Sequence, residues 1–395
     1  MSNALISDEI RMVVDMVRKF VRDKVQPLET EVENLGHIPT VSLSKLKSEA
    51  LMLGLYALNM PAEVGGGGLG NLDMCLVEEQ LGQTSDALIR RIFGQVYPML
   101  MACNPDQRES YLLPTIRGEK ICAMAITEPA AGSDAAAITT TARRDGEQWV
   151  LDGTKHFISD GDIADFIIVM ALTDPEKRAR GGITLFLVDK NTPGFLVART
   201  QAMLGHRGYG HAELVFSDCR IPASAVLGEV GGGFKLIMQS VSSIRLCHIG
   251  ARCTGMAQRV LEMMRQHAGT RKQFGAPIGD YQMVQKMIAD SAIEIYATRS
   301  MVLDCARDID FGLDPREKVS MIKVHASEML GRVADRGIQV FGGYGFSKDL
   351  PLERIYRDAR VTRIYDGTSE IHRMLIARSV IKNGLALSSV GGNWS

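Results

Sequence analysis

The stretch Arg363-Ile364-Tyr365-Asp366-Gly367-Thr368-Ser369-Glu370 decides how this sequence is interpreted. It holds a carboxylate, Asp366, next to a glycine and ahead of two hydroxyl side chains. A carboxylate in a dry pocket has a raised pKa and can accept a proton near neutral pH, whereas the same residue in a turn can act as a structural cap. Both roles are open for Asp366, so the surrounding segments have to distinguish between them.

Helical patterns flank this stretch and also begin the chain. Apolar residues recur at helical spacing at Ile249, Cys253, Met256, Val260 and Met263, and helical patterns continue nearly to the end. The same period appears between residues 10 and 21. The sequence therefore predicts an N-terminal helical domain at residues 1–120 and a C-terminal helical domain at residues 233–395.

The segment between these helical regions is rich in β-forming residues. Short β-rich runs, separated by Gly, Asp and Pro, occur at 148–151, 166–170, 183–188 and 213–216. The three glycines at 231–233 mark the boundary with the helices that follow. We therefore expect an α+β protein with a compact antiparallel β domain at residues 121–232.

Two segments of the β domain carry polar groups that suit a planar or phosphorylated ligand. In Ile126 to Asp134, a Gly-Ser-Asp loop offers hydroxyl and backbone N–H donors, although such a loop is also an ordinary turn. In Asp152 to Ser159, strand alternation places Phe157 and Ser159 on one face and His156 on the other. An aromatic ring and a hydroxyl on one face could contact a planar ring, or simply belong to the β core.

The C-terminal helices contain two further candidate binding segments. Arg271 to Ile278 follows a helix and Gln282 opens the next one; the Arg271 guanidinium suits a diphosphate or a solvated helix end. The glycines in Gln339 to Phe346 permit close approach of backbone to a ligand, or form a helix C-cap and turn.

Composition excludes several functional classes. The 395 residues are 46% hydrophobic with a formal net charge of −1, so no basic excess indicates nucleic acid or a membrane surface. The seven cysteines contain no Cys-x-x-Cys pair and lie in apolar surroundings, which predicts buried thiols in a reducing compartment. No histidine pair has metal-ligand spacing and no targeting or membrane-spanning run is visible, so we expect a cytoplasmic protein without a bound metal.

In order and spacing these segments resemble the acyl-CoA dehydrogenase family, from about residue 8 to residue 383. The matched elements are Thr127-Glu128-Pro129 with Gly132-Ser133-Asp134, Gly153-Thr154-Lys155, Arg271 to Ile278 with Gln282, Gln339 to Gly345, Arg357-Asp358 and Tyr365 to Arg373. The resemblance implies an N-terminal helical domain, a middle antiparallel β-barrel and a C-terminal four-helix-bundle domain, usually in homotetramers.

The resemblance also implies an FAD cofactor and the residues that bind it. By motif, the FAD contacts are Thr127, Gly132, Ser133, Phe157, Ser159, Arg271, Phe274, Gln282, Gln339, Gly343, Thr368 and Glu370, some of them across a subunit interface. Family members usually carry Trp and Thr in place of Phe157 and Ser159, and often Gln in place of Glu370. An aromatic face and a hydroxyl are nevertheless kept.

The family's catalytic base is a glutamate in Tyr-Glu-Gly-Thr, which this chain replaces with Asp366. Isovaleryl-CoA dehydrogenase instead carries its base just before the arginine that matches Arg245, where this chain has Ile244. The resemblance thus implies that Asp366 is the base and that Arg245 lies near the CoA phosphates and the active site. A missing methylene moves the carboxylate by about 1 Å, which can cost roughly 100-fold in rate, so the substrate or backbone should compensate.

Two departures from the family pattern concern the substrate. Arg90 and Arg91 lie where relatives build the acyl pocket, and glutaryl-CoA dehydrogenase and the sulfinopropionyl-CoA desulfinases place an arginine in this region. One inward-facing arginine would bind an anionic acyl end; two surface arginines are the alternative. The segment Gly208 to Glu213 is similar to the branch of large human members ten and eleven, which often has Asp-Gly-Pro at the base position.

The implied activity is FAD-dependent α,β-dehydrogenation of an acyl-CoA, with electrons passed to an electron-transfer flavoprotein by a homotetramer or dimer. A nitroalkane-oxidase-like enzyme remains an alternative, because that relative also uses aspartate at the base position. A desulfinase-like lyase is a third possibility. One family branch binds DNA through a basic extension, which the net charge of −1 argues against.

Overall fold

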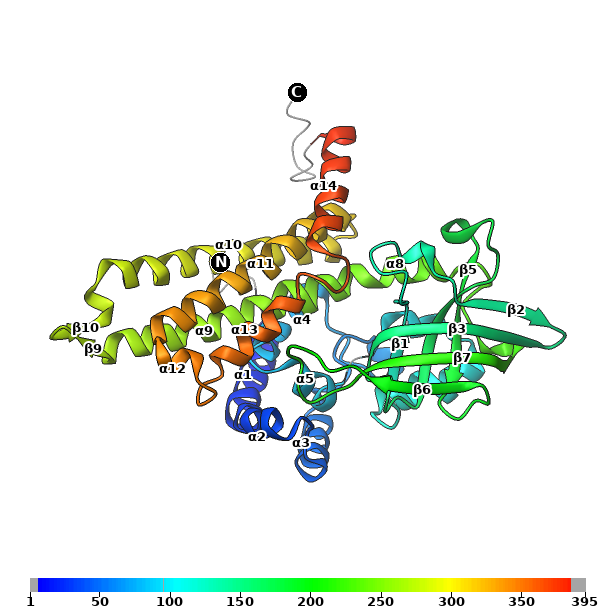
Figure 1. Ribbon diagram of the computed structural model, residues 1–395, viewed down its shortest axis with the longest axis horizontal. Coiled ribbons are helices and arrows are strands. Elements are labelled where there is room, and N and C mark those ends of the chain that lie inside the picture. The colour runs from blue at the N-terminus through cyan, green and yellow to red at the C-terminus, as the bar shows by residue number, and fades with distance from the viewer. Residues whose placement is uncertain (1–5, 95, 385–395) are drawn as a thin grey trace. The chain divides into compact units, whose positions relative to one another are not determined.

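A computed structural model of the protein describes residues 6–94 and 96–384 (Figure 1). The chain forms two compact units: a helical unit of residues 1–30, 70–85 and 242–395, and a sheet unit of residues 31–69 and 86–241. α2 (Glu29–Leu35) and α8 (Gly233–Ile244) begin in one unit and end in the other. Different segments of the predicted N-terminal helical region therefore belong to different units.

The helical unit is built on three long helices that lie side by side in Figure 1: α9 (Arg252–Thr270), α10 (Gln282–Asp310) and α11 (Arg316–Phe341). Its other elements are α1 (Asp8–Phe20), α4 (Asn71–Leu81), the hairpin β9 (Lys272–Gln273) and β10 (Ala276–Pro277), α12 (Gly343–Phe346), α13 (Leu352–Val361) and α14 (Ser369–Asn383). α4 packs against both α9 and α10, so an N-terminal helix joins the C-terminal bundle.

The predicted apolar stripe of α9 is largely confirmed. Cys253 and Val260 are buried, but Ala257 and Met264 complete the stripe, while Met256 and Met263 are half-buried. The helix is therefore rotated slightly from the face that methionine spacing suggested. Methionine is long and flexible, so it contacts the core from the edge of a buried face.

Glu29 anchors the start of the chain to the bundle through a buried ion-pair network. Its carboxylate accepts hydrogen bonds from Arg259 at 2.8 Å and 2.9 Å, from Arg354 at 2.7 Å and from the Thr84 hydroxyl at 2.7 Å. A buried carboxylate is stable only when its oxygens are paired in this way. The network joins four segments that are far apart in the sequence.

The sheet unit has eight strands, in the order β6-β7-β3-β2-β4-β5-β8 with β1 on β4. Their bounds are β1 (Cys122–Ala125), β2 (Thr141–Asp145), β3 (Gln148–Ser159), β4 (Phe166–Leu172), β5 (Ile183–Asp189), β6 (Phe195–Thr200), β7 (His211–Pro222) and β8 (Val226–Leu227). The unit also contains α3 (Thr40–Met52), α5 (Asp86–Ile92), α6 (Pro105–Gln107) and α7 (Leu113–Ile116). All four β-rich runs seen in the sequence are confirmed as strands.

The expected closed antiparallel barrel is wrong in two respects. The sheet is open, because β6 and β8 form its two ends and do not pair with each other. β8 has only two residues, too short a strand to complete a ladder. In addition, β4 pairs in parallel with both β1 and β2, so the sheet is mixed. The four-residue strand β1, which adds one of these parallel pairings, was not visible in the sequence pattern.

The seven cysteines are buried free thiols, as the sequence predicts. None of the helices in the described part of the chain is long and apolar enough to cross a membrane. Within residues 6–94 and 96–384, no group of three or more His, Cys, Asp or Glu side chains could hold a metal ion.

Candidate active site

Asp366 lies in a turn with left-handed backbone geometry at the start of α14. Its φ is +55°, and Gly367 follows with a φ of +91°. Aspartate tolerates this region better than most residues, because its short polar side chain can bond locally. The cap of α14 is Thr368, whose Oγ accepts a hydrogen bond from Ile371 N at 3.3 Å. The structural cap considered for Asp366 is therefore supplied by Thr368.

The backbone carbonyl of Asp366 is held from two sides within the helical unit. Arg245 Nε donates to it at 2.8 Å, and His372 Nε2 lies 3.1 Å from the same oxygen. Arg245 begins a π-helical turn (Arg245–Ala251), a geometry that is frequent at functional sites. A Cβ at position 367 would come within 2.9 Å of His372 Nε2, so only glycine fits there. The structure thus brings Arg245 and Asp366 together.

Two buried polar residues beside this turn were missed by sequence reasoning. Lys323 on α11 is 0% exposed, and its Nζ has no hydrogen-bond partner in the described part of the chain. Burial lowers its pKa to about 8, against the opposing attraction of Asp366. Burial also lowers the pKa of His372 to about 4, aided by Arg245 and Lys323. A lysine at a core position of a long apolar helix stripe was the signal that could have revealed Lys323.

In the sheet unit, a buried ion pair joins the two candidate flavin segments. Lys155 Nζ lies 2.8 Å from Glu128 Oε1 and donates to the Ile126 carbonyl at 3.0 Å. The Glu128 carboxylate also accepts from Thr139 N and Thr140 N. Desolvation alone would raise the pKa of Glu128, but Lys155 and these donors lower it to about 2. This pair explains why the Thr-Glu-Pro and Gly-Thr-Lys segments occur together.

Phe157 and Ser159 lie at a β-bulge on β3. The pairing of β3 with β7 shifts between Lys155 and Ile158, and Phe157 has a φ of +59°. Phe157 is 49% exposed and Ser159 is half-buried. The expectation that His156 faces the opposite side is wrong, because the bulge brings its ring to 4.2 Å from the Phe157 ring.

The loop that follows β1 lies next to this bulge. The Thr127 carbonyl accepts a hydrogen bond from His156 N at 2.8 Å. Gly132 and Ser133 are exposed on the turn that follows. An aromatic face, a hydroxyl and a polar loop are thus presented by neighbouring segments of the sheet unit.

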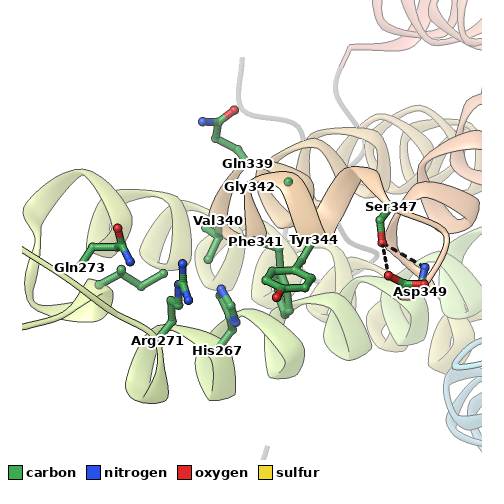
Figure 2. Close-up of a pocket in the computed structure, with 12 residues that line it drawn as sticks. His267, Arg271, Gln273, Gln339, Val340, Phe341, Gly342, Tyr344, Ser347 and Asp349 are labelled. Atoms are coloured by element: carbon green, nitrogen blue, oxygen red, sulfur yellow. Dashed lines mark hydrogen bonds between the residues drawn. The ribbon is translucent and has the colours of Figure 1, made fainter.

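In the helical unit, three predicted cofactor residues line one pocket of about 570 Å³: Arg271, Gln339 and Gly343. Figure 2 shows Arg271 beside His267, whereas the Gln339 side chain points away from them. His267 stacks on Phe341 with ring centroids 4.1 Å apart. Apart from its chain neighbours and the backbone of its own helix, no atom of the described residues lies within 4 Å of where a Gly343 Cβ would stand, so this backbone is open to a ligand.

Of the remaining predicted cofactor residues of the helical unit, Phe274, Gln282 and Glu370 are exposed and Thr368 is half-buried. Phe274 is 97% exposed at the turn of the β9–β10 hairpin, and Gln282 is exposed at the start of α10. Glu370 is exposed in the first turn of α14, two residues after Thr368. A fully exposed phenylalanine costs hydrophobic free energy unless another molecule covers it.

Arg90 and Arg91 are not the surface pair that formed the alternative interpretation. Their side chains are 9% and 11% exposed, and both guanidinium groups pair with Asp160, at 2.7 Å and 3.0 Å. Burial and the neighbouring Arg90 lower the pKa of Arg91, although Asp160 opposes this change. The structure therefore gives both arginines a carboxylate partner within the sheet unit.

Comparison with known proteins covers nearly the whole chain. The family models described as acyl-CoA dehydrogenase N-terminal, middle and C-terminal domains match residues 7–119, 123–219 and 231–381. An acryloyl-CoA reductase (NADH) of Anaerotignum propionicum is 36% identical, over 95% of each chain. The human mitochondrial short-chain specific acyl-CoA dehydrogenase is 35% identical, over 94% of this chain and 90% of its own.

A solved structure gives the same result at the level of the fold. Butyryl-CoA dehydrogenase from Megasphaera elsdenii superposes with a TM-score of 0.87 and 30% identity, covering 95% of this chain and 99% of its own. The three matching domain models, the two relatives above 30% identity and the common fold all indicate the same family. The chain therefore belongs to the acyl-CoA dehydrogenase family, a family of oxidoreductases that act on a CH–CH group.

Proposed function

We propose that this protein catalyses FAD-dependent α,β-dehydrogenation of an acyl-CoA thioester, with Asp366 as the base. The observation that carries the proposal is the Asp366 turn, because two donors fix its carbonyl and a separate residue caps the helix. The backbone of this turn is therefore held by Arg245 and His372, and the family position of the Asp366 carboxylate supports its role in proton transfer. The likeness to a short-chain acyl-CoA dehydrogenase and to a butyryl-CoA dehydrogenase supports a small acyl group.

The residues present fit the FAD that family members bind. Arg271 supplies a guanidinium for a diphosphate, and the Gly342-Gly343 backbone leaves room for close approach. Phe157 offers an exposed ring face and Ser159 a hydroxyl, the groups that contact a flavin ring. We propose that Phe274 and Gln282, both exposed, contact the FAD of a second subunit, in a homotetramer or dimer.

When bound, FAD accepts the hydride from the β carbon. Asp366 takes the α proton on a carboxylate oxygen, and Arg245 and His372 keep its main chain from moving as the proton arrives. Asp366 attracts the buried Lys323 cation and opposes the fall in the pKa of Lys323 that burial causes. Arg245 belongs to this machinery and, by family likeness, also lies near the CoA phosphates.

The experiment that tests this proposal is an anaerobic screen of acyl-CoAs against the FAD-loaded protein. We expect loss of the oxidised-flavin absorbance with a short-chain acyl-CoA, followed by reoxidation with an electron-transfer flavoprotein. Straight, branched and dicarboxylic acyl groups should be included, because the residues of the chain do not determine the branching or charge of the acyl group. Absence of bleaching by any acyl-CoA, with FAD bound, would contradict the proposal.

The same screen separates the alternatives. H₂O₂ formation from nitroethane would indicate a nitroalkane-oxidase-like enzyme, and sulfite release without flavin reduction a desulfinase. The likeness to an acryloyl-CoA reductase favours one further candidate, the same chemistry in the reductive direction. Reduction of an enoyl-CoA that is much faster than its formation would support that direction.

A further inference from the structure

A chain of hydrogen bonds runs through the sheet unit from the first turn of α5 to the end of β3. Tyr209 Oη donates to Asp86 Oδ2 at 3.0 Å and lies 2.8 Å from His206 Nδ1. His206 Nδ1 lies 3.3 Å from His211 Nε2. His211 Nδ1 lies 3.3 Å from Ser159 Oγ. These five residues form the histidine chain, which ends on the hydroxyl proposed to face the flavin.

The strand register brings the end of this chain together. Ser159 and His211 are direct partners on the antiparallel strands β3 and β7, so their side chains share a face. The bulge at Phe157 sets this register, because without its extra residue Ser159 would point to the other face. Gly210 allows the preceding loop to approach, since a Cβ there would lie 2.4 Å from Asp162 Oδ1.

The Asp86 carboxylate gives the histidine chain a direction. Tyr209 has one hydroxyl proton and donates it to Asp86, so its oxygen accepts from His206 Nδ1–H. The same Nδ1–H group of His206 is shared with a second acceptor, His211 Nε2. The His211 proton is then on Nδ1 and is donated to the oxygen of Ser159.

This direction requires a neutral His211, and its surroundings keep it neutral. Burial, the neighbouring His206 and the cation of Arg90 lower the pKa of His211 to about 4. The Arg90 guanidinium also lies over the Tyr209 ring, 5.5 Å from its centroid. A neutral imidazole has one N–H, so a single tautomer satisfies both contacts of His211.

We infer that the histidine chain holds the Ser159 hydroxyl as a hydrogen-bond donor to the flavin ring. Because His211 donates its proton to the Ser159 oxygen, the serine proton has to point away from His211 and is available to the flavin ring. A hydroxyl that donates to the ring favours its electron-rich, reduced form. His211 is therefore a positioning residue, and this inference rests on the proposed function because it assumes that Ser159 faces FAD.

The tautomer of His211 is the direct test, and it needs no FAD. Protein with ¹⁵N-labelled histidine should show His211 protonated on Nδ1, with its signals assigned by their loss in His211→Asn. His206 should also carry its proton on Nδ1. A His211 proton on Nε2 would reverse the chain, make Ser159 donate to His211, and overturn the inference.

The second test measures how strongly the protein prefers reduced over oxidised FAD, from the two-electron midpoint potential. His211→Leu should lower this preference about tenfold, as expected for one hydrogen bond, equal to a potential about 30 mV more negative. Ser159→Ala should give the same shift of the midpoint potential. The double variant should shift the potential no further than either single variant, because both substitutions act on the same interaction. His211→Asn should retain most of the preference, since its amide nitrogen can replace Nδ1.

The outcomes separate this inference from the proposed function. His37→Leu, at an exposed histidine, is the matched control and should leave the potential unchanged. An unchanged potential in a folded His211→Leu protein would overturn the inference while FAD reduction by acyl-CoA stands. Failure of the wild-type protein to bind FAD would instead remove the proposed function. If His211→Leu does not fold, judged by circular dichroism, the wild-type tautomer decides.

Discussion

At the residue scale, the turn at Asp366 shows how a shortened side chain fits the candidate active site. The carboxylate is one methylene shorter than the family's glutamate, yet its carbonyl is fixed by Arg245 at 2.8 Å and faces His372 at 3.1 Å. The left-handed φ of +55° favours a short polar residue over a longer one. The position of the carboxylate is therefore set by the backbone, and the substrate has to meet it there.

Substitution Asp366→Asn removes the proposed base and keeps both the size of the side chain and its tolerance of left-handed geometry. We expect flavin reduction by the true acyl-CoA to slow by about 100-fold or more, the usual contribution of a general base, with FAD still bound. Stopped-flow absorbance measures this rate. Asp106→Asn, an exposed carboxylate on α6, is the control. Reduction at the wild-type rate in Asp366→Asn would exclude Asp366 as the base.

At the scale of elements, one buried ion pair ties the loop that carries Thr127 to strand β3. Lys155 is completely buried and Glu128 nearly so, and each satisfies backbone groups of the loop as well as the other's charge. Burial lowers the pKa of Lys155 to about 8, although Glu128 opposes this change. The pair costs desolvation, but it gives the loop one fixed position against the strand.

Lys155→Met should therefore lower the free energy of unfolding by about 3–5 kcal/mol, because it leaves the Glu128 carboxylate buried without its cation. Adding Glu128→Gln should restore part of the loss. Lys286→Met breaks an exposed pair with Asp290 and should change stability by less than about 1 kcal/mol. Denaturant unfolding compares the variants. Equal effects of Lys155→Met and Lys286→Met would mean that the buried pair does not anchor the loop.

At the scale of the whole molecule, each unit contains one buried neutral histidine that resists protonation. Burial lowers the pKa to about 4 for both His211 in the sheet unit and His372 in the helical unit. In the unfolded chain a histidine binds its proton near pH 6.5. The unfolded state therefore takes up more protons than the folded state as the pH falls from about 6.5 to about 4.

The protein should lose stability across this pH window. Between pH 7 and pH 5 we expect the free energy of unfolding to fall by on the order of 2 kcal/mol for each of the two histidines. Denaturant midpoints at the two pH values measure the loss. His372→Gln should remove its own share of this loss, on the order of 2 kcal/mol, whereas His37→Gln, at an exposed site, should leave the pH dependence intact. A pH dependence unaltered by His372→Gln would contradict this account.

Periodic patterns in the sequence indicated the long helices and four of the strands, and their order along the chain. The helical spacing before Thr270 and the four β-rich runs predict structure correctly, because each depends on neighbours within a few residues. The ordered motifs likewise identified the family, and they indicated the segment in which Asp366 and Arg245 meet.

Only the tertiary structure decided which distant polar groups meet. Lys155 reaches Glu128 across a loop, Lys323 is buried beside Asp366, and His211 lies opposite Ser159. The last contact depends on a bulge at a positive-φ phenylalanine, and strand alternation counted along the sequence does not predict such a bulge. The open edges of the sheet likewise depend on which strands pair in space. A pairing between strands is a property of register and space, whereas a helical or strand period is a property of the chain itself.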